Sequence, residues 1–375
     1  MKRKLGEICR IVSGSTPKTD IPEYWDGDLK WVTPAELNDE SRVVNNTKRT
    51  ITELGATKTG LTPLPAGTVL LSSRAPIGKV AITGCEMYCN QGFKNLICSD
   101  SINNKYLYWF LKGKTQYLNS LGRGATFKEI SKTIVADIEI NLPDIEEQKK
   151  IVNRIEKIDS RLTILRAEIS RLDELIKARF VEMFGDGFET TELRNICKTT
   201  SGGTPSTKNP DYYNGTIPWV TTTALGPNHI DGTKAKAYIS EEAVANSATK
   251  IIPSGSILFG IRVGVGKTSI NDVDICTNQD IVAIMDVNEA KFSKLFIKHV
   301  LDANRAHYDS LKKGATILGI TSDDLKNTPI PLAPIKAQKD FETFVEQVDK
   351  SKFAVQKSLE KTQLLFDSLM QEYFG

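Results

Sequence analysis

The chain has 375 residues, of which 40% are hydrophobic and 25% are charged, and its formal net charge is +3 at pH 7. These values are ordinary for a globular protein, and the length allows two or three domains with cores of their own. No stretch approaches the ~18 consecutive apolar residues that cross a membrane. The first residues, 1–8, lack the apolar segment of a signal peptide. We therefore expect a cytoplasmic protein on which any basic surface is local.

The six cysteines are scattered along the chain. Scattered cysteines are typical of reduced, structural thiols in a cytoplasm. Cys85 and Cys89 have the spacing of half a zinc site, but no second pair of ligands follows nearby. We expect no metal site.

The first part of the chain, residues 1–143, consists of short apolar runs separated by Gly, Pro, Asn and Asp. Runs such as 67–72 and 79–83 predict β-strands. Residues 106–118 have the apolar spacing of a helix. We predict a mixed α/β domain whose long loops carry its recognition residues.

The next part, residues 144–186, predicts one long helix. Pro143 and Asp144 form a helix start, and acidic residues just after them suit the helix dipole. A helix from about residue 147 to 184 would span roughly 57 Å at ~1.5 Å per residue, and the glycines of residues 184–188 would end it. Its apolar residues alternate steps of four and three, as in a coiled coil. They are Ile151, Ile155, Ile158, Leu162, Leu165, Ile169, Leu172 and Ile176.

The second half of the chain repeats the first at a nearly constant spacing, with one shift of two residues. A repeat of this length is a domain plus an appendage and indicates internal pseudo-two-fold symmetry. The second domain is residues 187–333, with strands such as 281–285 and a helix over 293–311. The positions of the first copy that recur are Leu5, Ser13-Gly14, Thr16-Pro17, Trp31-Val32-Thr33, Arg74, Gly78-Lys79, Asn90-Gln91 and Gly124-Ala125-Thr126. In the same order, their counterparts in the second copy are Leu193, Ser201-Gly202, Thr204-Pro205, Trp219-Val220-Thr221, Arg262, Gly266-Lys267, Asn278-Gln279 and Gly314-Ala315-Thr316.

A second long helix is predicted over residues 334–375, following Pro334. Its seam is interrupted by Lys352 and Thr362, and comprises Phe341, Val345, Val348, Val355, Leu359 and Phe366. Because the first helix leads away from one domain and the second returns from the other, we expect an antiparallel pair, with Ile155 opposite a position near Leu365. The alternative is that each helix packs on its own domain. The predicted fold class is α/β, with two repeated mixed α/β domains separated by two long antiparallel coiled-coil helices.

Several segments imitate catalytic motifs without completing them. Residues 260–268 resemble a phosphate-binding loop, but Ile261 stands where the motif needs glycine. The three histidines, His229, His299 and His307, all lie in the second copy, so none is a repeated acid or base. We expect no catalytic residue and no cofactor.

The two copies share polar, glycine-containing loops. Arg74 with Lys79, and Arg262 with Lys267, each lie on such a turn. Arginine can bond two acceptors of guanine, and lysine suits phosphates. The alternative is a solvated hairpin. For Trp31 and Trp219 we favour core packing over a binding role.

Together these motifs resemble the specificity subunit of type I restriction–modification systems. They are Ser-Gly-Gly-Thr-Pro, Trp-Val-Thr, Arg…Gly-Lys, Asn-Gln and Gly-Ala-Thr, then a long helix ending in Phe-Gly, and the resemblance covers almost the whole chain in the family order. It implies two target-recognition domains, each reading one half of a bipartite site in double-stranded DNA. It also implies helices that fix the distance between the halves and bind two methyltransferase (modification) subunits. A restriction/translocase subunit would join through the complex, and catalysis would belong to the partners.

Two other functions stay open at this point: a DNA methyltransferase or ATPase in its own right, and a coiled-coil adaptor without DNA affinity. Cofactor binding would reveal the first, and the absence of a salt-dependent DNA shift the second. The copies diverge most at residues 38–50 and 226–238, where two different half-sites would be read. The candidate DNA contacts are Lys18, Arg42, Lys48, Arg49, Arg74, Lys79, Arg123, Lys128, Lys208, Lys234, Lys236, Arg262, Lys267, Lys312 and Lys313.

Overall fold

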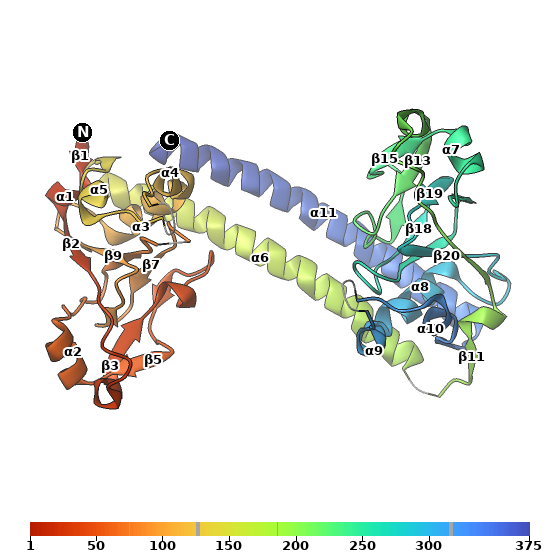
Figure 1. Ribbon diagram of the computed structural model, residues 1–375, viewed down its shortest axis with the longest axis horizontal. Coiled ribbons are helices and arrows are strands. Elements are labelled where there is room, and N and C mark those ends of the chain that lie inside the picture. Colours follow the sequence, from red (N-terminus) through yellow and green to blue (C-terminus); the bar gives the residue numbers. More distant parts are fainter. Residues whose placement is uncertain (75, 125–127, 186, 315–317) are drawn as a thin grey trace. The chain divides into compact units, whose positions relative to one another are not determined.

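The computed structural model (Figure 1) describes residues 1–74, 76–124, 128–185, 187–314 and 318–375. The chain forms two compact units. Unit 1 comprises Met1–Arg166 with Lys357–Gly375, and unit 2 comprises Ala167–Gln356. Each unit therefore contains one α/β domain together with segments of both long helices.

Unit 1 is built on a five-stranded sheet and a three-stranded sheet. The larger sheet is antiparallel except for its edge, where β4 runs parallel to β7. In the smaller sheet β3 is parallel to β8, so the carboxyl ends of these two strands lie at the same edge. The strand order of the larger sheet is β2 (Cys9–Ser13), β9 (Lys94–Cys98), β6 (Val69–Leu71), β7 (Val80–Thr83) and β4 (Val43–Val44). The order of the smaller sheet is β5 (Arg49–Ile51), β3 (Trp25–Val32) and β8 (Tyr88–Cys89). A separate pair is formed by β1 (Lys2–Lys4) and β10 (Glu139–Asn141).

Short helices cover these sheets and close the main core of unit 1. The predicted helix 106–118 is in fact two, α3 (Asn104–Gly113) and α4 (Thr115–Ser120). They are separated at Lys114, where φ is −100° and ψ is 15°. The apolar spacing runs through the break because both helices pack on the same core. The other helices are α1 (Leu5–Ile8), η1 (Pro22–Tyr24), η2 (Pro34–Glu36), α2 (Glu53–Thr59) and α5 (Lys132–Ala136).

Unit 2 repeats this topology strand for strand and adds β16. The parallel pairs β13–β19 and β14–β18 correspond to β3–β8 and β4–β7. The strand order of the larger sheet is β12 (Lys198–Ser201), β20 (Ile281–Met285), β17 (Ile257–Gly260), β18 (Thr268–Asn271) and β14 (His229–Ile230). The order of the smaller sheet is β15 (Ala237–Ile239), β13 (Ile217–Val220), β19 (Ile275–Thr277) and β16 (Ile251–Ile252). A separate pair is formed by β11 (Thr190–Glu192) and β21 (Pro329–Pro331). The prediction of two repeated mixed α/β domains is confirmed.

The helix predicted over 293–311 is also divided, into α8 (Lys294–Ala303) and α9 (Arg305–Leu311). The break is at Asn304, whose side-chain amide donates to the Val300 carbonyl at 2.8 Å. This bond takes up a carbonyl at the end of α8. The remaining helices of unit 2 are η3 (Leu193–Asn195), η4 (Pro210–Tyr213), α7 (Glu241–Ala245) and α10 (Ser322–Lys326).

The two long helices, α6 (Ile145–Phe184) and α11 (Ile335–Phe374), have 40 residues each. The Asp144 carboxylate accepts the Glu147 N–H at 2.8 Å and so caps the start of α6. At its end, Gly185 donates to the Val181 carbonyl at 2.8 Å, and Gly187 has a φ of +92°. Asp186 of the predicted stop lies outside the described residues. Among the residues that are described, no helix is both long and apolar enough to cross a membrane.

Within each unit the two long helices run antiparallel, as predicted. In unit 1 the Arg154 guanidinium donates to the Tyr373 hydroxyl at 2.9 Å, and that of Arg166 donates to Gln363 at 3.1 Å. Numbers that rise along α6 therefore fall along α11. In unit 2, Phe180 of α6 packs edge-on against Phe341 of α11.

The seam residues differ in burial. Lys352, which interrupts the seam, forms an ion pair with Asp173 at 2.5 Å. The expectation that Ile155 lies opposite a position near Leu365 was wrong. Leu365 is 51% exposed and lies one residue outside the seam. The bond between Arg154 and Tyr373 instead puts Ile155 near Tyr373. Buried seam positions are Ile151, Ile155, Leu162, Leu165, Ile176, Phe341, Val345 and Val348, and half-buried ones are Ile158, Ile169, Leu172, Val355, Leu359 and Phe366.

Candidate nucleic-acid interface

In unit 1, loops from distant parts of the sequence meet at the carboxyl ends of β3 and β8. Four backbone hydrogen bonds join them: Ser15 to Cys89 at 3.1 Å, Asn90 to Val32 at 3.1 Å, Ser73 to Gly92 at 2.7 Å and Ile130 to Ser73 at 2.9 Å, each from N–H to carbonyl. We call the described residues of 13–17, 73–79, 90–92 and 122–130 loop platform 1.

Unit 2 contains the same four bonds. They run from Gly203 to Thr277 at 2.8 Å, Asn278 to Val220 at 3.1 Å, Ile261 to Asp280 at 2.8 Å and Ile320 to Ile261 at 2.8 Å. The described residues of 201–205, 261–267, 278–280 and 312–320 form loop platform 2. The polar motifs that the two copies share thus lie on one surface of each unit. The Ala-Thr parts of the Gly-Ala-Thr motifs, at 125–126 and 315–316, are outside the described residues.

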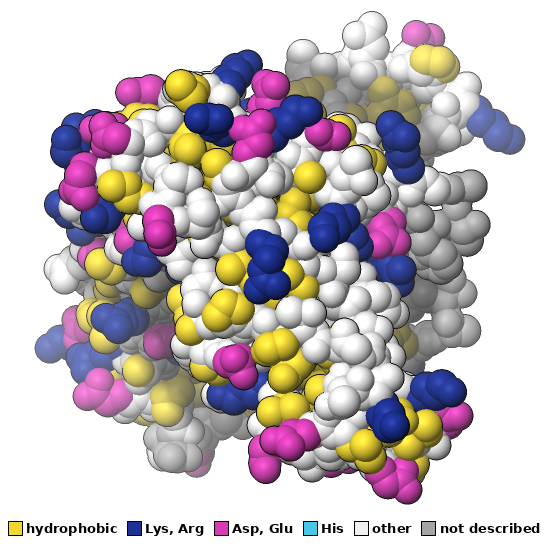
Figure 2. Space-filling model, turned by 90° about the vertical axis from the view of Figure 1, so that its left-hand side faces the viewer, with side chains coloured by type: hydrophobic (Ala, Val, Ile, Leu, Met, Phe, Trp, Pro, Cys, Tyr) yellow, Lys and Arg dark blue, Asp and Glu magenta, His cyan; other side chains and the backbone are white. Residues whose placement is uncertain are grey.

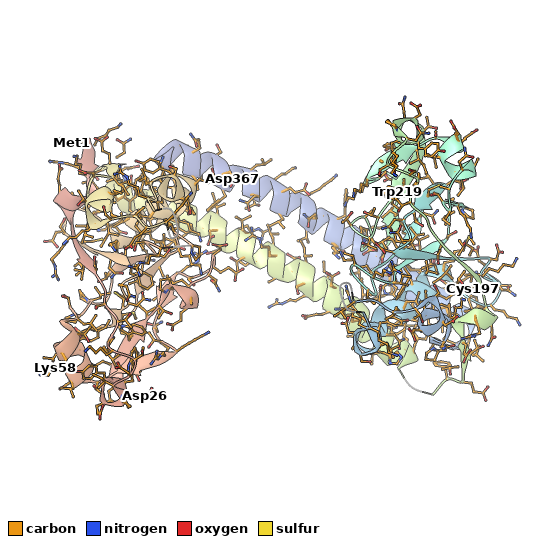
Figure 3. The ribbon with its side chains drawn as sticks, viewed as in Figure 1. Met1, Asp26, Lys58, Cys197, Trp219 and Asp367 are labelled. Carbon is orange, nitrogen blue, oxygen red and sulfur yellow. The ribbon has the colours of Figure 1, made fainter. Side chains whose placement is uncertain are left out.

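Glycine and tryptophan fix the position of the first loop in each platform. A Cβ on Gly14 would lie 2.1 Å from the Asn90 carbonyl oxygen, and one on Gly202 would lie 2.2 Å from the Thr277 hydroxyl. The buried indole of Trp31 donates to the Ser15 carbonyl at 3.1 Å, and that of Trp219 donates to the Gly203 carbonyl at 3.0 Å. Figure 3 labels Trp219 on its strand, and its burial agrees with a core role.

A threonine–glutamine pair links two loops on each platform. The Thr204 hydroxyl donates to the Gln279 amide oxygen at 2.5 Å, and Thr16 makes the same bond to Gln91. Both glutamines are exposed. An exposed amide held at a fixed place has the donor and acceptor groups that read base edges.

The arginines of the two platforms have different neighbours. Arg74 donates to the Glu129 carboxylate at 2.9 Å, which also accepts from the largely buried Lys94 at 3.0 Å. Partial burial acts to raise the pKa of Glu129, but hydrogen bonds from Lys94 and Arg74 outweigh it and hold that pKa below its ordinary value. In unit 2, Gly319 occupies the position that corresponds to Glu129.

Arg262 instead faces Asp280, with 3.6 Å between guanidinium nitrogen and carboxylate oxygen. Each arginine is therefore balanced by a carboxylate, but from a different loop. The two platforms share a backbone frame and present different charges, which suits two different targets.

Several other predicted contacts have intramolecular partners. Lys79 donates to the carbonyls of Pro34, at 3.2 Å, and of Leu37. The Arg49 guanidinium lies 3.5 Å from the centre of the Trp25 ring, Arg42 pairs with Asp159, and Lys312 pairs with Asp309. These side chains hold the fold of their loops. Lys267 is half-buried beside Gly264.

The remaining predicted contacts are exposed cations with no ion pair among the described residues. Figure 2, a view of unit 1, shows cations and carboxylates interspersed over that face. Such exposed cations suit phosphate contacts. They are Lys18, Lys48, Arg123, Lys128, Lys208, Lys234, Lys236 and Lys313.

Residues 1–174 and 185–364 match the family described as type I restriction modification DNA specificity domain. The chain belongs to this family. It is 28% identical to the type I restriction enzyme MjaIX specificity subunit of Methanocaldococcus jannaschii, over 98% of this chain and 91% of that protein. It is 24% identical to the EcoDI specificity subunit of Escherichia coli, over 69% of this chain and 65% of the relative.

Two solved structures share the fold. One, from a study of complex assembly and conformational transition of the type I R-M system, has a TM-score of 0.65 and 18% identity and covers all of this chain and 97% of its own. The other is a type I restriction-modification S subunit from M. genitalium, with a TM-score of 0.57, 15% identity, and coverage of 100% and 96%. At these identities the likeness shows the fold alone.

Proposed function

We propose that this chain is the sequence-specific DNA-recognition subunit of a type I restriction–modification complex. The observation that carries the proposal is the pair of loop platforms, which have the same backbone bonds and different side chains. Membership of the DNA specificity family supports it. Each platform would read one half of a bipartite site in double-stranded DNA.

The proposed division of labour has four parts. Residues 1–143 and 187–333 are the target-recognition domains, and 144–186 and 334–375 are the spacers. The bounds of α6 and α11 support these limits. In this proposal the paired helices would fix the number of base pairs between the half-sites.

The long helices would also bind the methyltransferase subunits, two in number, and a restriction subunit would join through them. Both helices expose large apolar side chains, which is consistent with contacts to partner subunits. Leu364 is 70% and Phe353 62% exposed. The others on the helices are Ile164, Leu175, Val181 and Leu365. In this scheme the chain itself is non-catalytic and needs no cofactor.

The test is methylation by the chain assembled with its methyltransferase subunits, on a DNA library with randomised half-sites and spacers. We expect one bipartite sequence with a fixed spacer. Because binding would use ~6–10 phosphate contacts, affinity should fall on the order of 10³–10⁵-fold between ~50 and ~200 mM salt. Methylation by the isolated chain would instead support an enzyme, and an assembled complex without sequence preference would support an adaptor.

A further inference from the structure

In each unit a groove lies where the loop that differs most between the copies meets a long helix. The groove of unit 1 has a volume of about 750 Å³ and is lined by residues 39, 40 and 42 and by α3, α6 and α11. That of unit 2 has about 880 Å³ and is lined by residues 226–229, α8, α6 and α11. Among the aspartates that line the grooves, Asp159 on α6 and Asp349 on α11 occupy equivalent positions of the repeat.

In unit 1, Asp159 holds the start of the variable loop. It forms an ion pair with Arg42 and is only 15% exposed. The Arg42 guanidinium also lies 5.3 Å from the centre of the Trp109 ring, so it is held from two sides. The carbonyl of the preceding residue, Ser41, accepts from the Tyr108 hydroxyl at 3.1 Å. These contacts fix the position of the loop immediately before it enters β4.

In unit 2, Asp349 performs the same task with a different partner. Its carboxylate accepts the side-chain amide of Asn228 at 2.6 Å. The Asn228 carbonyl accepts from the Ile270 N–H at 2.9 Å, which ties the residue to β18. The loop then enters β14, the counterpart of β4.

We propose that Asp159 and Asp349 are positioning residues for half-site recognition, each orienting the target-reading loop of its own unit from a long helix. This inference rests on the proposed function. A carboxylate suits the task because it can accept from a guanidinium or from an amide. The helix residue is thus the same in the two copies while the loop residue that it holds is different, as required if one frame supports two readouts.

The test uses Asp159→Asn and Asp349→Ala in the chain assembled with its methyltransferase subunits. Half-site selectivity is measured as methylation of the cognate sequence relative to single mismatches, for each half separately. We expect Asp159→Asn to lower selectivity about tenfold in the half read by unit 1 and to leave the other half unchanged. Asp349→Ala should do the reverse; alanine is used there because asparagine would keep an oxygen that accepts from Asn228.

Further variants separate positioning from general stability. Arg42→Ala and Asp159→Ala should each lower selectivity, and the double variant should lose no more than either one, because they remove the same pair. Asp159→Glu, which keeps the carboxylate, should recover part of the selectivity. Glu168→Gln on α6 and Asp340→Asn on α11 are matched controls at exposed positions and should behave as the wild type.

Loss of selectivity in both halves from one aspartate variant would overturn the proposal, as would wild-type selectivity in both variants once they are assembled. An additive Arg42→Ala/Asp159→Ala pair would also contradict it. These results differ from failure of the proposed function, in which the wild-type complex itself would show no half-site preference.

Discussion

At the scale of single residues, the loop platforms depend on close approach of backbone to backbone. The first loop of each platform passes so near to the end of β8 or β19 that only glycine fits at Gly14 and Gly202. We expect Gly14→Ala to lower the free energy of unfolding by roughly 1–3 kcal/mol, because the added methyl group meets backbone oxygen that cannot move away. Chemical denaturation measures it.

Gly113→Ala is the matched control. Its Cβ would meet only the terminal methyl of Met370, at 2.8 Å, and a flexible side-chain end can shift. Gly113 also lies at the end of α3, where alanine is at least as favourable as glycine. A loss of stability in Gly14→Ala no larger than that in Gly113→Ala would show that the loop can retreat from the strand.

His299 is a half-buried titratable group outside the platforms. It lies on α8 between Phe180 and Phe341, and its Nε2 has no hydrogen-bond partner among the described residues. Burial, with a smaller contribution from the charge of Lys298, lowers its pKa to about 4, while Asp302 acts in the opposite direction.

This shift predicts a pH dependence of stability. A histidine whose pKa is lower in the folded state stabilises the fold above its unfolded pKa of about 6.5, and that stability is lost as pH falls toward 4. Between pH 7.5 and 5 the loss should be about 2 kcal/mol. His299→Phe keeps an aromatic ring among the phenylalanines and should remove this part of the pH dependence in urea unfolding.

His307→Gln, at an exposed position of the same unit, is the control. It should leave the pH dependence as in the wild type. Equal slopes of stability against pH in His299→Phe and the wild type would mean that the imidazole reaches water in the folded state.

At the scale of elements, the register of the helix pair can be tested in unit 1. The bonds Arg154–Tyr373 and Arg166–Gln363 place Leu162 opposite Phe366. Cysteines at these two positions should form a crosslink within one chain, because opposing seam positions bring their Cβ atoms together. Peptide mapping by mass spectrometry identifies it.

Leu162→Cys with Leu364→Cys is the matched control. Leu364 lies on α11, like Phe366, but is largely exposed. It should crosslink far more slowly. A fast crosslink in the control, or one only between chains, would contradict the register.

The elements themselves were largely predictable from the sequence. Repeated apolar runs gave β6, β7 and β20, and the heptad pattern with its caps gave α6 and α11. The breaks at Lys114 and Asn304 were not visible, because apolar periodicity continues across a single non-helical residue when both segments face one core. The platform motifs were found because they are repeated.

What the sequence could not show was which loops meet and which charges pair. Arg74 and Glu129, or Arg42 and Asp159, are far apart in sequence, and no local rule joins them. Several predicted DNA contacts were therefore cations with partners inside the fold. The internal repeat carries one further signal: aspartate occupies the same helix position in both copies, at Asp159 and Asp349, and each of them lies beside the variable loop of its unit.

At the scale of the whole molecule, the proposed spacer role requires that both helices change length together. Each has 40 residues, and they pair in antiparallel register within each unit. We expect that one heptad inserted after Leu165 and another after Thr362, which lie at nearly opposing positions, will preserve the seam. Seven residues lengthen a helix by roughly 10 Å at ~1.5 Å per residue, which corresponds to about 3 base pairs at ~3.4 Å each.

The assembled complex should then methylate the same two half-sites with a spacer longer by about 3 base pairs. A heptad inserted after Leu165 alone is the control: its residues have no partner on α11, so we expect lower stability and no defined new spacer. The measurement is methylation of the library with randomised spacers. If the double insertion altered a half-site sequence, or left the spacer unchanged, reading and spacing would not be separate properties, because the helices would then act on the loops and not on the distance between them.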